Sequence, residues 1–185
     1  AWLVASRTRA PAPIADAERV VVMVHGFMGR GAFFAPLADR VREELGAEVL
    51  VYDYPSRYEF ERIVTGLRRF VTGHVPPRAK VSLVGHSLGG LVCRAYVQEH
   101  DSRERVDRLV TIACPHRGTG IANVVPTSLG RTLRPWSAHV RRLATTADRL
   151  ERLRPTVIVA SHDHIVPRHA SRPNFATGAV HVIDG

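Results

Sequence analysis

Short runs of aliphatic and β-branched residues alternate along this chain with longer stretches in which apolar positions recur at helical spacing. Leu37, Val41 and Leu45, for example, fall on one face of a helix. This alternation is typical of a parallel sheet that helices cover on both faces. The pattern predicts strands at 20–24, 48–52, 81–84, 106–113, 156–160 and 179–183, and helices at 32–45, 59–71, 88–100 and 138–153.

The predicted architecture is therefore an α/β fold with three layers, in which a mostly parallel central sheet of about six strands lies between helices. With 185 residues in total, we expect residues 20–185 to form one domain and residues 1–19 to be a linker or the remnant of an upstream segment. The stretch 117–154 combines a loop rich in glycine and proline with the last helix. We expect it to form a small cap over the carboxyl ends of the strands.

The composition narrows the class of protein. A hydrophobic fraction of 45% and a charged fraction of 23% exclude a disordered chain, and two cysteines exclude a disulfide scaffold. The longest unbroken apolar run, 20–24, is too short to span a membrane. Ala1–Val4 is apolar and is followed by two arginines and two prolines, an order that fits the end of a signal or anchor helix as well as an ordinary chain boundary. The compartment stays open, with secretion or membrane anchoring as alternatives.

The net charge of +9 raises the question of an anionic partner. Lys80 is the single lysine, and the arginines are spread along the chain in runs no longer than pairs, without aromatic platforms beside them. This distribution does not favour nucleic-acid binding. It does favour contact with anionic surfaces, including lipid headgroups.

Glycine and polar residues follow four of the predicted strands, in the stretches 25–29, 85–90, 114–119 and 161–164. Ligands of open α/β sheets bind outside the carboxyl ends of the strands. We therefore expect one functional site at that edge of the sheet.

The stretch Gly85-His86-Ser87-Leu88-Gly89 has the form G-x-S-x-G, between a predicted strand and a predicted helix. Such a turn holds its serine in a strained backbone conformation, and the neighbours two residues away must be small. We expect the Ser87 hydroxyl to point into the site as a nucleophile, near the free amides at the start of the helix. His86 is expected to be part of the turn and not the base.

A serine nucleophile needs a base and two donors for the oxyanion that forms on the attacked carbonyl. We expect one donor to be the backbone amide of Leu88. The second is expected to be the backbone amide of Phe27, in the glycine turn after the first strand.

These segments, together with Pro115–Thr119 and Asp163–Pro167, resemble the α/β-hydrolase superfamily, and within it the compact bacterial lipases and esterases. The resemblance covers nearly the whole chain from residue 20 and implies an α/β-hydrolase fold without its C-terminal part. It implies Ser87 as the nucleophile, Phe27 and Leu88 as the oxyanion hole, and Asp163 as the acid that orients the base. It further implies carboxylic or lipid esters as substrates and no cofactor.

Other assignments at this edge fit less well. Asp53 precedes the serine, against the order Ser, Asp, His of the superfamily. The histidines beside Asp163, His162 and His164, raise the question of a metal site, but alternation along the chain directs both away from the aspartate, so we expect no metal. Cys93 and Cys114 are expected to be buried packing residues.

The histidine of the superfamily lies in the loop after the last strand, and the sequence ends at Gly185, inside or just before that loop. His169 comes too early in the chain, and His181 lies within the strand. We expect the base to follow within a few residues of Gly185, with a displaced His181 as the alternative.

The chemistry expected is ester hydrolysis through an acyl-enzyme on Ser87. Three alternatives stay open: a thioesterase or acyltransferase on the same fold, a non-catalytic binding module that retains the fold, and a charge-driven binder of anionic surfaces. The side chains of Phe33, Phe34, Trp136 and the pair Val124-Val125 are candidates to line an acyl pocket.

Overall fold

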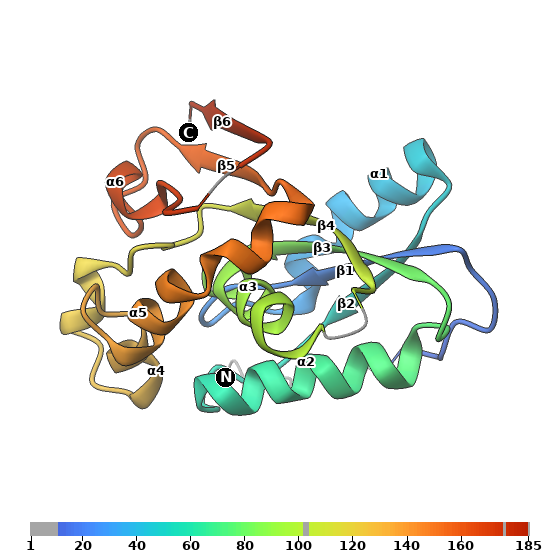
Figure 1. Ribbon diagram of the computed structural model, residues 1–185, viewed down its shortest axis with the longest axis horizontal. Helices are drawn as coiled ribbons and strands as arrows, with labels where there is room; N and C mark the ends of the chain where they lie inside the picture. Colours follow the sequence, from blue (N-terminus) through green and yellow to red (C-terminus); the bar gives the residue numbers. More distant parts are fainter. Residues whose placement is uncertain (1–10, 102–103, 176, 185) are drawn as a thin grey trace, which may run out of the picture.

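The computed structural model describes residues 11–101, 104–175 and 177–184. Its centre is a sheet of six strands in the order β2-β1-β3-β4-β5-β6, and every neighbouring pair is parallel (Figure 1). The α/β class, the parallel sheet and the number of strands are as predicted. The strands are β1 (Arg19–Val24), β2 (Glu48–Tyr52), β3 (Lys80–His86), β4 (Val106–Ile112), β5 (Thr156–Ala160) and β6 (Ala179–Ile183).

Helices connect the strands and cover both faces of the sheet. They are η1 (Gly31–Phe34), α1 (Ala35–Leu45), α2 (Phe60–His74), α3 (Leu88–His100), η2 (Gly120–Asn123), α4 (Ser128–Thr132), α5 (Ala138–Thr145), η3 (Ala147–Leu153) and α6 (Arg168–Ser171). Two differences from the predicted elements stand out. The expected helix 138–153 is divided into α5 and η3, and the short helices η2, α4 and α6 were not expected.

The alternating residues of β1 explain the three layers. Val20, Val22 and Val24 are buried in the cluster that also holds the apolar faces of α2 and α3. Val21 and Met23 point the other way, into a smaller cluster with Phe34 of η1 and with α1. Because successive residues of a strand face opposite sides, a run that is apolar throughout is buried from both sides. Figure 1 shows α1 and α2 on opposite sides of the sheet.

The segment 117–154 holds η2, α4, α5 and η3, and Figure 1 shows α4 and α5 at one edge of the molecule. Its buried residues Leu129, Leu143 and Leu150 join the core cluster of α2 and α3. The segment is therefore packed onto the main domain. Its role as a cap stays a prediction.

The described part of the N-terminal segment also lies against the domain. The Ile14 amide donates to the His74 carbonyl at the end of α2 (2.9 Å), and Ile14 and Ala17 pack on the core. The apolar stretch Ala1–Val4 lies outside the described residues. In the ranges given above, none of the helices is both long enough and apolar enough to cross a bilayer.

Candidate active site

Ser87 occupies the sharp turn that joins β3 to α3. Its backbone angles, φ 50° and ψ −121°, lie in a region that residues with a side chain rarely adopt. The turn closes only because its flanking residues are glycines. A Cβ atom on Gly85 would lie 2.6 Å from the Gly89 carbonyl oxygen, and one on Gly89 would lie 2.1 Å from the Val24 carbonyl oxygen. The G-x-S-x-G pattern therefore forms the strained strand-to-helix turn that the sequence predicts.

Backbone hydrogen bonds hold the turn in register. The Ser87 amide donates to the Ile112 carbonyl at the end of β4 (2.8 Å), and the Gly90 amide donates to the Ser87 carbonyl (3.0 Å). Ser87 is consequently fixed at the carboxyl edge of the sheet, between β1 and β4, where the expected site lies.

The two expected amide donors lie on either side of this serine. Leu88 opens α3, and the loop of Phe27 follows β1 closely enough that a Cβ atom on Gly26 would lie 3.0 Å from the Ser87 Cβ. Within the described parts of the chain, neither the Phe27 amide nor the Leu88 amide has an acceptor in the protein. Amides that are free at a helix N-terminus and in a neighbouring turn are the donors that an oxyanion requires.

A pair of rings fixes the loop of Phe27, and sequence reasoning assigned them no role. The buried His25 ring stacks on Tyr54 at a centroid distance of 4.1 Å. His25 Nδ1 donates to the Gly26 carbonyl (2.8 Å), and His25 Nε2 lies 2.8 Å from Asp53 Oδ1 and 3.2 Å from the Tyr54 amide nitrogen.

The Tyr54 hydroxyl completes the connection by donating to the His25 carbonyl (2.7 Å). Burial raises the pKa of Tyr54, so this hydroxyl keeps its proton for the hydrogen bond. The residue in the sequence that signals this contact is Tyr54, just after the second strand. Its role depends on its contact with His25, which follows β1, and the sequence does not show that contact.

Asp163 lies in the loop after β5, as expected. Its Oδ1 accepts hydrogen bonds from the amides of Ile165 (2.8 Å) and Val166 (2.9 Å), which hold the carboxylate in a tight turn. Desolvation lowers the pKa of His86, and the negative charge of Asp163 opposes this shift. The carboxylate of Asp163 therefore lies close enough to His86, the residue before Ser87, to affect its pKa.

Three of the described histidines, His116, His169 and His181, do not occupy the position expected for the base. His181 pairs with Ile158 in the middle of β6, three strands from β3, or about 14 Å at the usual strand spacing. His169 is exposed on α6. His116 is fully buried, hydrogen-bonded to Thr111 (3.0 Å), and burial lowers its pKa far below the ordinary value.

Both cysteines are buried behind the turn. Burial raises the pKa of Cys93 and of Cys114, so both thiols stay protonated and unreactive. A Cβ atom on Gly90 would lie 2.7 Å from the Cys114 sulfur, so Cys114 packs directly against α3. Their expected burial is confirmed.

Ser87 opens into a cleft of about 600 Å³, a size typical of small-molecule sites. Phe33 and Phe34 line this cleft, as expected. Two other candidates for an acyl pocket do not lie there. Trp136 is 60% exposed and lines a separate hollow between α2 and α5, and Val124 is 77% exposed. Both positions depend on how the segment 117–154 folds, which spacing in the sequence does not specify.

A sequence profile described as the alpha/beta hydrolase family matches residues 21–185, nearly all of the domain. The chain belongs to the alpha/beta hydrolase family. The order of the segments, with the Ser87 turn after β3 and the Asp163 loop after β5, agrees with the resemblance that the sequence carries.

Curated relatives of this alpha/beta hydrolase include the human lysosomal thioesterase PPT2, with 31% identity over 115 residues. The match covers 59% of this chain and 38% of the thioesterase.

Two solved structures illustrate the fold. The mature lipase BlEst2 of Bacillus licheniformis has a TM-score of 0.60 at 17% identity, over 81% of this chain and 68% of the lipase. The metagenomic carboxyl esterase MGS0156 has a TM-score of 0.65 at 18% identity, over 84% of this chain and 53% of the esterase. At these identities the likeness establishes the fold.

Proposed function

We propose that this alpha/beta hydrolase is a serine hydrolase that cleaves carboxylic esters, with Ser87 as the nucleophile. The observation that carries the proposal is the strained Ser87 turn with two amides, of Phe27 and Leu88, that lack acceptors in the described residues. The first amide of a helix is always free, so the distinguishing feature is that the Phe27 amide, in a separate loop, is free among the described residues beside the same hydroxyl. The same observation argues against a binding module that has lost its chemistry.

The reaction proceeds through an acyl-enzyme. The Ser87 oxygen bonds to the acyl carbon, the bond from that carbon to the leaving oxygen breaks, and the Ser87 proton passes through the base to the leaving alcohol. Water then bonds to the acyl carbon, the bond from that carbon to the Ser87 oxygen breaks, and a proton of the water passes through the base to Ser87 as the acid is released. The Phe27 and Leu88 amides donate to the carbonyl oxygen when it carries negative charge, an interaction worth roughly 3 kcal/mol for each donor.

Asp163 is the proposed acid that orients the base. A histidine supplied by the segment after β6 would emerge beside it, because the Ser161 amide donates to the Ile183 carbonyl at the end of β6 (2.9 Å). The Ser161 hydroxyl also donates to Asp184 (3.0 Å), which joins the ends of β5 and β6 at the edge that carries Asp163. This geometry favours the segment after β6 over His181 as the source of the base.

Thioesters are the second candidate substrates. The match to a lysosomal thioesterase favours them, and the acyl-enzyme chemistry is the same with sulfur as the leaving atom. Lipid-derived esters are a third class, which the net charge of +9 and the likeness to a lipase fold support. Ser87 bonds to the acyl carbon in the same way in all three classes of substrate.

The test uses the natural protein with p-nitrophenyl butyrate and the matching butyryl thioester as substrates. Ser87→Ala is expected to lower kcat on the order of 10⁶-fold and to abolish labelling by a fluorophosphonate probe. Ser82→Ala, on the same strand but hydrogen-bonded to Asp107 away from the site, is the matched control and is expected to retain activity. Equal turnover by the Ser87→Ala variant and the unmodified protein would refute the proposal.

A further inference from the structure

Ser87 lies where two cavities of very different size meet. Besides the cleft of about 600 Å³, a slot of about 60 Å³ opens at the same serine. Both are lined by Phe27, Ser87 and Ile165, so the serine and one proposed amide donor stand at the boundary between them. An ester has two arms that diverge from its carbonyl carbon. A carbonyl held at Ser87 therefore directs one arm into each cavity.

The slot is apolar and narrow. Its walls come from the segment after β4, through Pro115, Ala122, Val125 and Leu133, and from Val166 after β5. An apolar cavity of about 150 Å³ accepts benzene, so a slot with less than half of that volume has room for an acyl group of about two to four carbons. Longer groups require its walls to move.

Direct contacts join the walls of this slot. The Thr119 hydroxyl donates to the Ile165 carbonyl (2.6 Å), which ties the segment after β4 to the loop after β5. The Thr119 amide donates to the Leu133 carbonyl (2.8 Å). Gly130 packs so closely on Val125 that a Cβ atom there would lie 2.4 Å from the Val125 carbonyl oxygen. These contacts leave little freedom for the slot to widen.

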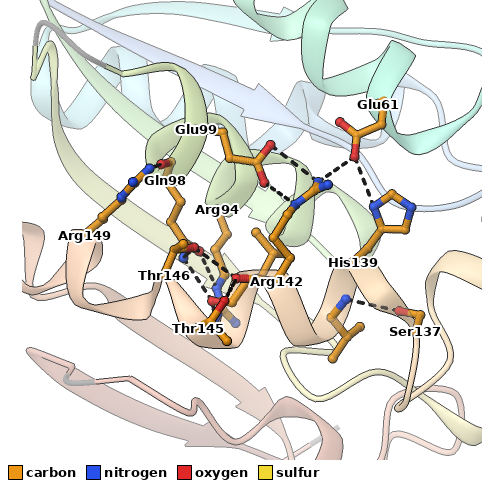
Figure 2. Close-up of polar contacts among 12 residues, drawn as sticks. Glu61, Arg94, Gln98, Glu99, Ser137, His139, Arg142, Thr145, Thr146 and Arg149 are labelled. Atoms are coloured by element: carbon orange, nitrogen blue, oxygen red, sulfur yellow. Dashed lines mark hydrogen bonds and ion pairs between the residues drawn. The ribbon is translucent and has the colours of Figure 1, made fainter.

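The segment 117–154, part of which lines the slot, is also fixed at α5. Figure 2 shows Arg142 of α5 between Glu99 of α3 (2.9 Å) and Glu61 of α2 (2.5 Å). Deeper in, the fully buried Arg94 donates to the Leu143 carbonyl and to Gln98 Oε1 (2.8 Å). Gln98 Nε2 in turn donates to the Leu143 carbonyl (3.0 Å). The segment that walls the slot is thus held to α2 and α3 by polar contacts at both its exposed and its buried side.

We propose, on the basis of the serine-hydrolase function above, that the slot holds the acyl group and restricts the substrate to short acyl chains, while the cleft takes a larger alcohol or thiol. The order of the reaction assigns the arms. The acyl group stays bonded to Ser87 while the alcohol leaves and water enters, so the roomy cleft serves the leaving group and the water. The small apolar slot suits the group that remains.

The first experiment measures kcat/KM of the natural protein for p-nitrophenyl esters with acyl chains of 2, 4, 8 and 12 carbons. We expect the highest values at two to four carbons and a fall of at least tenfold by eight, because an added methylene that does not fit costs about 10-fold or more. A parallel series of acetate esters with growing alcohols is expected to vary less than about threefold. A steep alcohol series with a flat acyl series would reverse the assignment and overturn the proposal.

The second experiment changes the slot itself. Val125→Ala is expected to raise the ratio of kcat/KM for the eight-carbon ester to that for the two-carbon ester by about tenfold, and Ala122→Val to lower the four-carbon value relative to the two-carbon value. The neighbouring Val124→Ala removes the same atoms from a side chain that lines neither cavity and is expected to leave the profile unchanged. An unchanged profile in both slot variants would overturn the proposal.

The two proposals fail in different ways. Absence of hydrolysis of every ester and thioester by the folded natural protein would refute the serine-hydrolase function. Hydrolysis that is lost in Ser87→Ala but is fastest for eight or twelve acyl carbons would leave that function intact and refute the short-acyl slot.

Discussion

The serine turn and the segment 117–154 stand on either side of the same site, and different parts of the chain hold each in place. The turn is determined by backbone packing, since Gly89 lies against the carbonyl groups of Val24 and His25, and Gly85 against the backbone of Gly89 and Gly90, within distances that exclude a side chain. The segment is determined by side chains far away in the sequence, because Arg94 and Arg142 connect α5 to α2 and α3 (Figure 2).

Because of this difference, the proposed nucleophile and the proposed selectivity for substrates depend on different parts of the chain. The turn is held by backbone atoms, which side-chain substitutions elsewhere in the chain leave in place, so we expect the proposed nucleophile to be robust to such substitutions. The wall of the slot depends on long-range polar contacts, so substitutions remote from Ser87 are expected to change which substrates fit. Most of the substitutions predicted below weaken one of these two regions at a time.

The largest effect is expected from Gly89→Ala. The new Cβ would meet two backbone carbonyl oxygens, of Val24 at 2.1 Å and His25 at 2.5 Å, and neither can move without shifting β1. We expect a loss of at least about 3 kcal/mol of unfolding free energy, measured by urea denaturation. Gly73→Ala in α2, with open space around its Cβ, is the control and is expected to gain about 0.5–1 kcal/mol. Equal losses in both variants would contradict the backbone explanation.

Arg94→Met is expected to cost about 2 kcal/mol and to loosen α5. Burial lowers the pKa of Arg94 to about 10, so its removal relieves a desolvated charge, but the acceptors at Leu143 and Gln98 lose a donor. We also expect longer acyl chains to be accepted. Chemical denaturation and the ester series measure the two effects. Arg141→Met, exposed on the same helix, is the control, and a matching change there would argue against a role for the buried contact.

The fold is expected to lose stability in acid through His116. Burial lowers its pKa, so below about pH 6.5 the unfolded chain takes up a proton that the folded chain excludes, and stability falls as the pH falls. The contribution is at most about 1.4 kcal/mol per pH unit. Urea midpoints at pH 7.5 and 5.0 measure it. His116→Asn is expected to flatten this dependence, whereas His164→Asn, an exposed control, keeps it; the opposite order would contradict the assignment.

The smallest effect is expected from Arg142→Met. This arginine is 43% exposed, so its ion pairs with Glu61 and Glu99 are weakened by solvent and are worth about 0.5–1 kcal/mol. The difference from the unmodified protein should shrink between 0.05 and 0.5 M salt, as denaturation midpoints would show. A difference that is independent of salt would indicate that packing of the arginine stem matters more than its charge.

The division of the predicted helix 138–153 shows where sequence reasoning fails. Its apolar spacing continues through Leu150, which is buried as a helical face requires. Gln98, nearly fifty positions earlier, donates to the Leu143 carbonyl and the Thr146 hydroxyl, and the α-helix ends at Thr145. A periodic pattern cannot report a partner at that distance. Trp136 and Val124 were misplaced as pocket residues for the same reason.

The sequence alone determined the parallel sheet, the family and the turn of Ser87, because apolar runs and closely spaced glycines are local properties that each short stretch carries by itself. It also placed Asp163 after β5. Only the tertiary structure decided that His25 and Tyr54 fix the loop of Phe27, that His181 lies three strands from Ser87, and that the site divides into a cleft and a slot. Those properties depend on which distant side chains meet, and packing in three dimensions settles that.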